Sequence, residues 1–290
     1  MFGMETNEHT QSACEGVAAQ SVDDTPRVAT RTLSATLSYD GAPFNGFARQ
    51  PGQLTVQGEI EKALRTLFRR EVEVTCAGRT DAGVHALGQV VSFEVDQDEL
   101  RDRTLRSLRR SLNALTHEGI VIREVEERNG GFSARFDAVS REYRYRICID
   151  EAPPVFTKGF AWHISAPLDV KAMEEGARYL VGEHDFKSFC MAASAVGKPT
   201  CRYVDEISFS RETVMGEDLL VVKIVGNAFL HSMVRTIIGT LVLVGKGKRD
   251  ASWVASVLEA RDRSVAGENA PAAGLTLWSV DYDGPRMYEP

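Results

Sequence analysis

The sequence predicts an α+β fold, with a mainly antiparallel sheet in two similar halves, helices packed on the sheet and a central cleft between the halves. Two observations support this prediction. Segments that alternate apolar and polar residues predict strands, and they come in consecutive pairs separated by single segments of helical apolar spacing. The same arrangement then repeats in the second half of the chain. A doubly wound parallel sheet would instead alternate strands and helices one by one, so it is not expected.

The chain is expected to fold as an ordered body that follows an acidic extension. Of its 290 residues, 43% are hydrophobic and 26% are charged, which is ordinary for a globular protein. Residues 1–30 are rich in acidic side chains and lack apolar periodicity, so they predict a disordered extension. The N-terminal half is expected over residues 31–150 and the C-terminal half over residues 151–290.

In the first half, an alternating strand and a turn-rich loop lead into an amphipathic helix. Thr55 is the expected N-cap of this helix, because a threonine hydroxyl can accept a hydrogen bond from the first turn. A second helix carries leucines inward and arginines outward, as amphipathic helices do. The predicted elements are strand 32–39, loop 40–53, helix 55–70, strands 72–76 and 84–95, helix 97–115, and strands 120–125 and 140–149.

The second half repeats this arrangement with three helices. One of them is strongly apolar and begins after two consecutive strands. The predicted elements are helix 170–181, strands 204–210 and 219–225, helices 228–244 and 251–260, and strand 275–282.

Several classes of protein are excluded by what the sequence lacks. It has no run of about 18 apolar residues, which a membrane helix requires, and its N-terminus lacks the layout of a secretory signal. The five cysteines are scattered and form no C-x-x-C pair, so reduced thiols and a cytoplasmic location are expected. No nucleotide-binding glycine loop and no metal-binding histidine motif occurs, so neither a nucleotide cofactor nor a metal is expected.

The net charge of −7 does not by itself indicate a partner. The acidic extension contributes much of it, and the remaining basic residues are mostly arginines. Arginine suits phosphate contacts and base stacking, which favours nucleic acid, but a GC-rich genome produces the same bias.

The segment GRTDAGVHA at residues 78–86 stands at a strand-to-strand junction, where a side chain can project into a cleft. Asp81 lies between Gly78 and Gly83, whose backbone freedom permits a tight turn and the close approach of a ligand. Asp81 is therefore either a reactive carboxylate or the cap of its own turn. His85 could be its acid/base partner, although a histidine in this position more often bonds a backbone carbonyl.

The apolar helix predicted over 228–244 carries one arginine, Arg235. A buried guanidinium is costly unless it is paired, so Arg235 requires a carboxylate. That partner could be Asp81, or any acidic residue in a structural ion pair.

The segment SREYRYRIC at residues 140–148 predicts a strand with two different faces. Tyr143 and Tyr145 share one face, and Arg144 and Arg146 share the other. Tyrosines interleaved with arginines suit base stacking and phosphate contacts. A core strand with charged residues on its outer face gives the same pattern.

Taken together, these segments resemble the bacterial branch of the TruA family of tRNA pseudouridine synthases. The matching segments follow the family's order and cover nearly all of the chain from residue 31 onward. They are YDGAPFNGF (39–47), TVQGEIEKAL (55–64), AGRTDAGVHALGQVVSF (77–93), FSARFDAVSREYRYRI (132–147), GEHDFKSF (182–189), GNAFLHSMVRTIIGTL (226–241) and AAGLTLWSVDY (272–282).

The resemblance implies a cofactor-free isomerisation of uridine to pseudouridine at positions 38, 39 and 40 in the anticodon stem-loop of tRNA. By motif position, Asp81 corresponds to the catalytic aspartate and Tyr143 to the tyrosine that packs on the target uracil. Arg235 corresponds to the arginine that pairs with the aspartate, and Arg79 to one associated with substrate RNA and base extrusion. The resemblance also implies a homodimer that holds tRNA across both subunits.

The implied chemistry requires an ionised carboxylate, which either attacks the sugar or takes a proton from C2′. The target base must also be flipped out of its stem. Six arginines are candidates for phosphate contact, namely Arg101, Arg106, Arg109, Arg110, Arg141 and Arg144. The alternatives are a family member with other RNA targets and a non-enzymatic RNA-binding protein on the same scaffold.

The sequence departs from the family pattern in two places. Phe47 and Ala48 stand where tryptophan and glutamine are common, and Ser133 stands where histidine is usual. These departures could alter RNA contacts or site choice without changing the chemistry.

Overall fold

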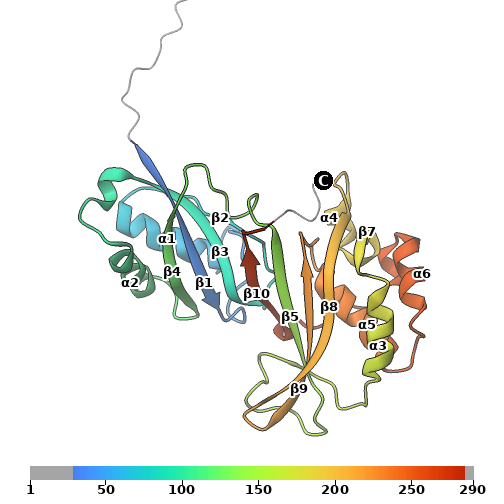
Figure 1. The fold of residues 1–290 in the computed structure, drawn as a ribbon. Coiled ribbons are helices and arrows are strands. Elements are labelled where there is room, and N and C mark those ends of the chain that lie inside the picture. Colours follow the sequence, from blue (N-terminus) through green and yellow to red (C-terminus); the bar gives the residue numbers. More distant parts are fainter. Residues whose placement is uncertain (1–28, 285–290) are drawn as a thin grey trace, which may run out of the picture.

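The computed structural model describes residues 29–284, which form one continuous mixed sheet with helices packed against it (Figure 1). The strand order is β4-β1-β3-β10-β5-β9-β8-β7, with β2 beside β3 and β6 beside β5. The strands are β1 (Thr30–Tyr39), β2 (Thr75–Cys76), β3 (His85–Asp96), β4 (Ile120–Arg128), β5 (Ser140–Cys148), β6 (Trp162–His163), β7 (Gly182–Asp185), β8 (Cys201–Val214), β9 (Glu217–Gly226) and β10 (Leu275–Asp281).

The pairing is antiparallel except between β3 and β10 and between β5 and β6. The predicted α+β class with a mainly antiparallel sheet is therefore confirmed. The last strand of the chain, β10, lies between β3 and β5 and so connects the two halves of the sheet (Figure 1). Its pairing with β3 is short, with Thr276 opposite His85 and Leu277 opposite Ala86.

Figure 1 shows α1 and α2 beside the first half of the sheet, and α3, α5 and α6 beside the second. One hydrophobic core extends from Leu33 and Leu37 of β1 to Ile237 and Ile238 of α5. The α-helices are α1 (Val56–Phe68), α2 (Leu105–Leu115), α3 (Val170–Arg178), α4 (Ala192–Ala195), α5 (Met233–Gly245) and α6 (Trp253–Ala260). No helix in the described residues is long and apolar enough to cross a membrane.

The predicted cap of the first helix is confirmed. The Thr55 side chain accepts a hydrogen bond from the Gly58 backbone N–H at 3.3 Å, and α1 begins at the next residue. The helix ends at Arg69, whose backbone is left-handed (φ 57°).

Two predicted helices begin several residues too early, for local reasons. The helix expected over 97–115 is divided into a 3₁₀ turn (Gln97–Leu100) and α2, because Thr104 starts a new helix by accepting from the Ser107 N–H at 3.1 Å. The helix expected from residue 228 begins only at Met233, because Ser232 has a left-handed backbone (φ 60°) that an α-helix does not allow. The residues just before Met233 therefore form a turn rather than the first turn of α5.

Several short elements were not predicted, namely β6, β7, α4 and the 3₁₀ turns Phe186–Phe189, Arg263–Val265 and Ala272–Gly274. The strand expected over 72–76 pairs with β3 only at Thr75 and Cys76. Of the predicted extension, residues 1–28 lie outside the described residues, and β1 already begins at Thr30. The division at residue 150 remains a prediction.

Candidate active site

Asp81 lies in the loop between β2 and β3, and the backbone on either side of it is held in place. The Asp81 carbonyl accepts a hydrogen bond from the Val84 N–H at 3.1 Å, which closes a tight turn. Gly83 within this turn has a φ of 76°, which glycine adopts without strain. The carbonyl of Thr80 accepts from the Phe47 N–H at 3.0 Å. The loop is therefore fixed against the segment that follows β1.

Two buried polar side chains from outside this loop, Tyr39 and Gln89, also hold it in place. The Tyr39 hydroxyl lies 2.8 Å from the Thr80 hydroxyl, and the Gln89 amide donates to the Gly78 carbonyl at 2.6 Å. Tyr39, Thr80 and Gln89 are all buried. A buried, hydrogen-bonded network of this kind favours one loop conformation over others.

The structure brings together Asp81 and Arg235, which the sequence places far apart. Nη1 of Arg235 lies 3.0 Å from Oδ2 of Asp81, and the two side chains are 18% and 20% exposed. The same guanidinium donates through Nε to the Ala270 carbonyl at 2.8 Å. Asp81 is therefore part of an ion pair between the two halves of the chain rather than only a turn cap.

Two further residues contact Asp81 that the sequence analysis did not identify. The Ser232 hydroxyl donates to Oδ2 of Asp81 at 2.8 Å, and Nε2 of His231 lies 3.3 Å from Oδ1. Both residues fall inside the helix that the sequence predicts over residues 228–244. The observed start of α5 at Met233 instead puts them in the turn that faces the Asp81 loop.

Tyr143 is buried on β5, near the Asp81 loop. Its ring packs edge-on against Phe229, with ring centroids 5.1 Å apart. Burial raises the pKa of the Tyr143 hydroxyl, and the negative charge of Asp81 raises it further, so this hydroxyl stays protonated at neutral pH. Tyr145, on the same face of β5, donates to the Pro271 carbonyl at 2.8 Å and is a packing residue.

Arg79 precedes Asp81 by two residues and is exposed. It makes no hydrogen bond or ion pair within the part of the chain that the structure describes. Its side chain is therefore available to a molecule bound at the surface of the loop.

His85 has a structural environment rather than a catalytic one. It is buried, its Nδ1 accepts from the Gly41 N–H at 3.0 Å, and its Nε2 lies 3.0 Å from the Gly159 carbonyl. Burial is the main reason that the pKa of His85 is lowered, against the opposing effect of Asp40. A neutral His85 thus joins three backbone segments, as the alternative interpretation of the sequence expected.

One predicted phosphate contact is wrong. Arg141 is buried, and its guanidinium donates to four backbone carbonyls, those of Ala77, Ala138, Asn227 and Arg135. Arg141 thus provides hydrogen-bond donors for backbone carbonyls of several neighbouring segments. It can do so because its planar guanidinium carries five N–H donors.

The other arginine expected on this strand, Arg144, faces outward. It forms an ion pair with Glu142 at 2.7 Å, and its guanidinium lies 3.9 Å from the centre of the Trp278 ring. Arg144 is therefore held on the face of the sheet opposite Tyr143 and Tyr145.

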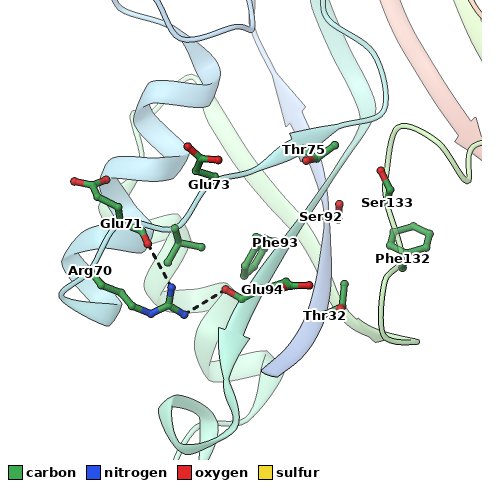
Figure 2. Close-up of a pocket in the computed structure, with 11 residues that line it drawn as sticks. Thr32, Arg70, Glu71, Glu73, Thr75, Ser92, Phe93, Glu94, Phe132 and Ser133 are labelled. Atoms are coloured by element: carbon green, nitrogen blue, oxygen red, sulfur yellow. Dashed lines mark hydrogen bonds between the residues drawn. The ribbon is translucent and has the colours of Figure 1, made fainter. Parts of the chain in front are cut away.

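Two hollows on the described part of the surface are not lined by Asp81. One has a volume of about 350 Å³ and lies between the end of α1, β3 and the segment around Ser133. Figure 2 shows Arg70 at one side of this hollow, donating to the backbone carbonyls of Glu71 and Glu94. Ser133, one of the departures from the family pattern, lines this hollow, whereas Phe47 is buried in the core and acts through packing.

Within residues 29–284, no group of three or more His, Cys, Asp or Glu side chains could hold a metal ion.

Known proteins are similar to this chain over most of its length. A family model described as tRNA pseudouridine synthase matches residues 35–137 and 177–283. A tRNA pseudouridine synthase A of Brevibacillus brevis is 47% identical over 254 residues, which cover 87% of this chain and 100% of that protein. The tRNA pseudouridine synthase A of Bacillus subtilis is 44% identical over 253 residues, covering 87% of this chain and 99% of that protein. The chain belongs to the tRNA pseudouridine synthase family.

Proposed function

We propose that this chain isomerises uridine to pseudouridine at positions 38, 39 and 40 in the anticodon stem-loop of tRNA, with Asp81 as the catalytic residue. Membership of the tRNA pseudouridine synthase family supports the reaction. The resemblance of GRTDAGVHA to the bacterial branch supports the positions.

One observation carries the assignment of Asp81. Its carboxylate is 20% exposed and receives donors from Arg235 and Ser232 on the same oxygen. These donors hold the carboxylate in one orientation at the surface, where a flipped nucleotide can reach it. The reaction needs an ionised carboxylate, and a neighbouring guanidinium provides the complementary charge.

The reaction consists of three changes in one nucleotide. The bond between N1 of uracil and C1′ of ribose breaks, the uracil turns while it remains bound, and C5 bonds to C1′. The proton on C5 then leaves for solvent while a proton is gained at N1, so the product is an isomer of the substrate. Asp81 serves the first change, either by attack on C1′ or by removal of a proton from C2′.

Tyr143 and Arg79 act on the base rather than on the bond. A base in a stem cannot reach a side chain of the enzyme, so the nucleotide must be flipped out of the helix. We place the flipped uracil against the ring of Tyr143, which packs against Phe229 and whose hydroxyl stays protonated. Arg79, exposed beside Asp81, is positioned to occupy the space that the extruded base leaves.

We further propose that the active form is a cytoplasmic homodimer that holds one tRNA across both subunits. This proposal rests on the resemblance to the bacterial family. Light scattering of the purified protein tests it: a particle of twice the chain mass is expected, and a monomer with full activity would contradict it.

The reaction itself is tested with unmodified tRNA whose uridines carry tritium at C5. Release of tritium to solvent, with pseudouridine mapped afterwards at positions 38, 39 and 40, is the expected result. Tight tRNA binding without tritium release would instead support a non-enzymatic RNA-binding protein. Release with pseudouridine at other positions would support a different set of targets.

A further inference from the structure

Ser232 stands at the N-cap of α5 but does not cap it. A capping serine has an extended backbone, and its hydroxyl accepts a hydrogen bond from the first helical turn. Thr55 and Thr104 have these properties at the starts of α1 and α2. Ser232 has a left-handed backbone (φ 60°, ψ 10°), and its side chain makes no capping hydrogen bond. Its hydroxyl is used for something other than helix formation.

That hydroxyl is directed at the carboxylate of Asp81. It lies 2.8 Å from Oδ2, the oxygen that also receives Nη1 of Arg235 at 3.0 Å. The other oxygen, Oδ1, lies 3.3 Å from Nε2 of His231, whose side chain is 48% exposed. The donors on Oδ2 come from more buried side chains, with Ser232 9% exposed and the Arg235 side chain 18% exposed. Oδ2 thus faces the protein, and Oδ1 faces the open side.

We infer that Ser232 is a positioning residue for the reaction: together with Arg235 it fixes Oδ2 of Asp81 and presents Oδ1 to the substrate. This inference rests on the proposed function of Asp81. The left-handed backbone supports it independently, because a serine is strained in this region and such strain persists where the surroundings impose it. Here the strain turns the hydroxyl away from the helix and toward the carboxylate.

Two substitutions at this position separate the hydroxyl from the backbone. Ser232→Ala and Ser232→Gly both remove the donor, but only glycine adopts the left-handed region without strain. We expect kcat for tritium release to fall by about 10- to 100-fold in both variants, the loss that a misplaced reacting group causes. The Kd for tRNA should stay within about twofold of wild type. The melting temperature of the glycine variant should equal or exceed that of the alanine variant.

A matched control is Thr104→Ala, which removes the hydroxyl of a true N-cap in α2. It should lower the melting temperature and leave kcat unchanged, whereas Ser232→Ala should lower kcat and leave the melting temperature unchanged. Turnover of Ser232→Ala within about twofold of wild type would overturn the inference. Unequal turnover of the alanine and glycine variants would also overturn it, since the effect would then belong to the backbone. A wild-type protein that releases no tritium would overturn the proposed function itself, and this inference with it.

Discussion

Arg235 serves two groups at once, which makes its guanidinium difficult to replace. Nη1 contacts the Asp81 carboxylate and Nε donates to the Ala270 carbonyl. A lysine has one compact ammonium group and cannot reproduce this fork. We expect Arg235→Lys to lower kcat by at least about tenfold and the free energy of unfolding by about 1–3 kcal/mol, since one buried acceptor loses its donor. Tritium release and urea denaturation measure the two effects.

Arg79 provides the contrasting control. It is exposed and makes no hydrogen bond or ion pair within residues 29–284, so Arg79→Ala should leave the urea midpoint unchanged while weakening turnover of tRNA.

The prediction for Arg235 has a clear contrary outcome. A stable and fully active Arg235→Lys variant would show that the contact between Arg235 and Asp81 is not needed for the reaction.

The sequence indicated only part of the site at this scale. Asp81, Tyr143 and Arg235 stand in recognisable segments, and an arginine in an apolar helix needs a carboxylate wherever it lies. The contacts of Ser232 and His231 with Asp81 could not be predicted from the sequence. Their role depends on where α5 begins, and apolar periodicity does not fix helix ends to within a few residues.

Among the structural elements, the loop before β6 depends on one carboxylate. Glu217, the first residue of β9, accepts hydrogen bonds from the backbone N–H groups of Val155, Phe156 and Thr157 and from the Thr157 hydroxyl. Burial alone would raise the pKa of Glu217, but these four donors lower it to about 2. Glu217 thus holds an exposed apolar loop, with Val155 75% exposed, in one conformation.

The pH dependence of stability follows from this lowered pKa. The folded pKa lies below the ordinary value of 4.5, so the folded state binds the proton less readily than the unfolded chain. The stabilisation is complete above about pH 4.5 and is lost as the pH falls toward about 2. Between about pH 5.5 and about pH 3, the urea midpoint should fall more for wild type than for Glu217→Gln. An equal fall of the urea midpoint in both proteins would show that Glu217 does not cause the acid sensitivity of the fold.

The outer face of α2 is the clearest candidate for contact with the tRNA backbone. Arg106 and Arg110 are exposed on it, whereas Arg109 donates to the Arg123 carbonyl at 3.0 Å and is already engaged. We expect the double variant Arg106→Glu, Arg110→Glu to bind tRNA more weakly and to reduce the slope of log affinity against log salt by about 2. Unchanged affinity and slope, measured by filter binding, would place the RNA surface on another element.

In the molecule as a whole, β10 connects the two halves across a close contact with β3. Gly88 of β3 leaves room for it, because a Cβ there would lie 2.5 Å from the Trp278 carbonyl oxygen. Gly88→Ala should therefore force β10 away and lower the free energy of unfolding by about 1–3 kcal/mol. Turnover should fall as well, since Asp81 and Arg235 come from opposite sides of this junction.

Gly130 is the matched control, because a Cβ added there meets no atom within 4 Å. Gly130→Ala should leave both thermal unfolding and turnover unchanged. Equal behaviour of the two alanine variants would show that the junction between β3 and β10 does not constrain the site.

The overall architecture was predictable in class but not in its central connection. Period-two alternation predicted most strands of the sheet, because buried and exposed side chains must alternate along them. It could not predict that the last strand inserts between β3 and β5, because partner choice is a long-range property that local patterns do not contain. The division of the helix over residues 97–115 was missed for the opposite reason, a single local cap at Thr104.

The most direct test of the central claim compares wild-type protein with Asp81→Asn on tRNA that carries tritium at C5 of its uridines. Asparagine keeps the size of the side chain and can still accept from Ser232 and Arg235, so the variant should fold and bind tRNA as wild type does. We predict tritium release by the wild type and none above background by Asp81→Asn. Release by both proteins at similar rates would contradict the claim that Asp81 is the catalytic group.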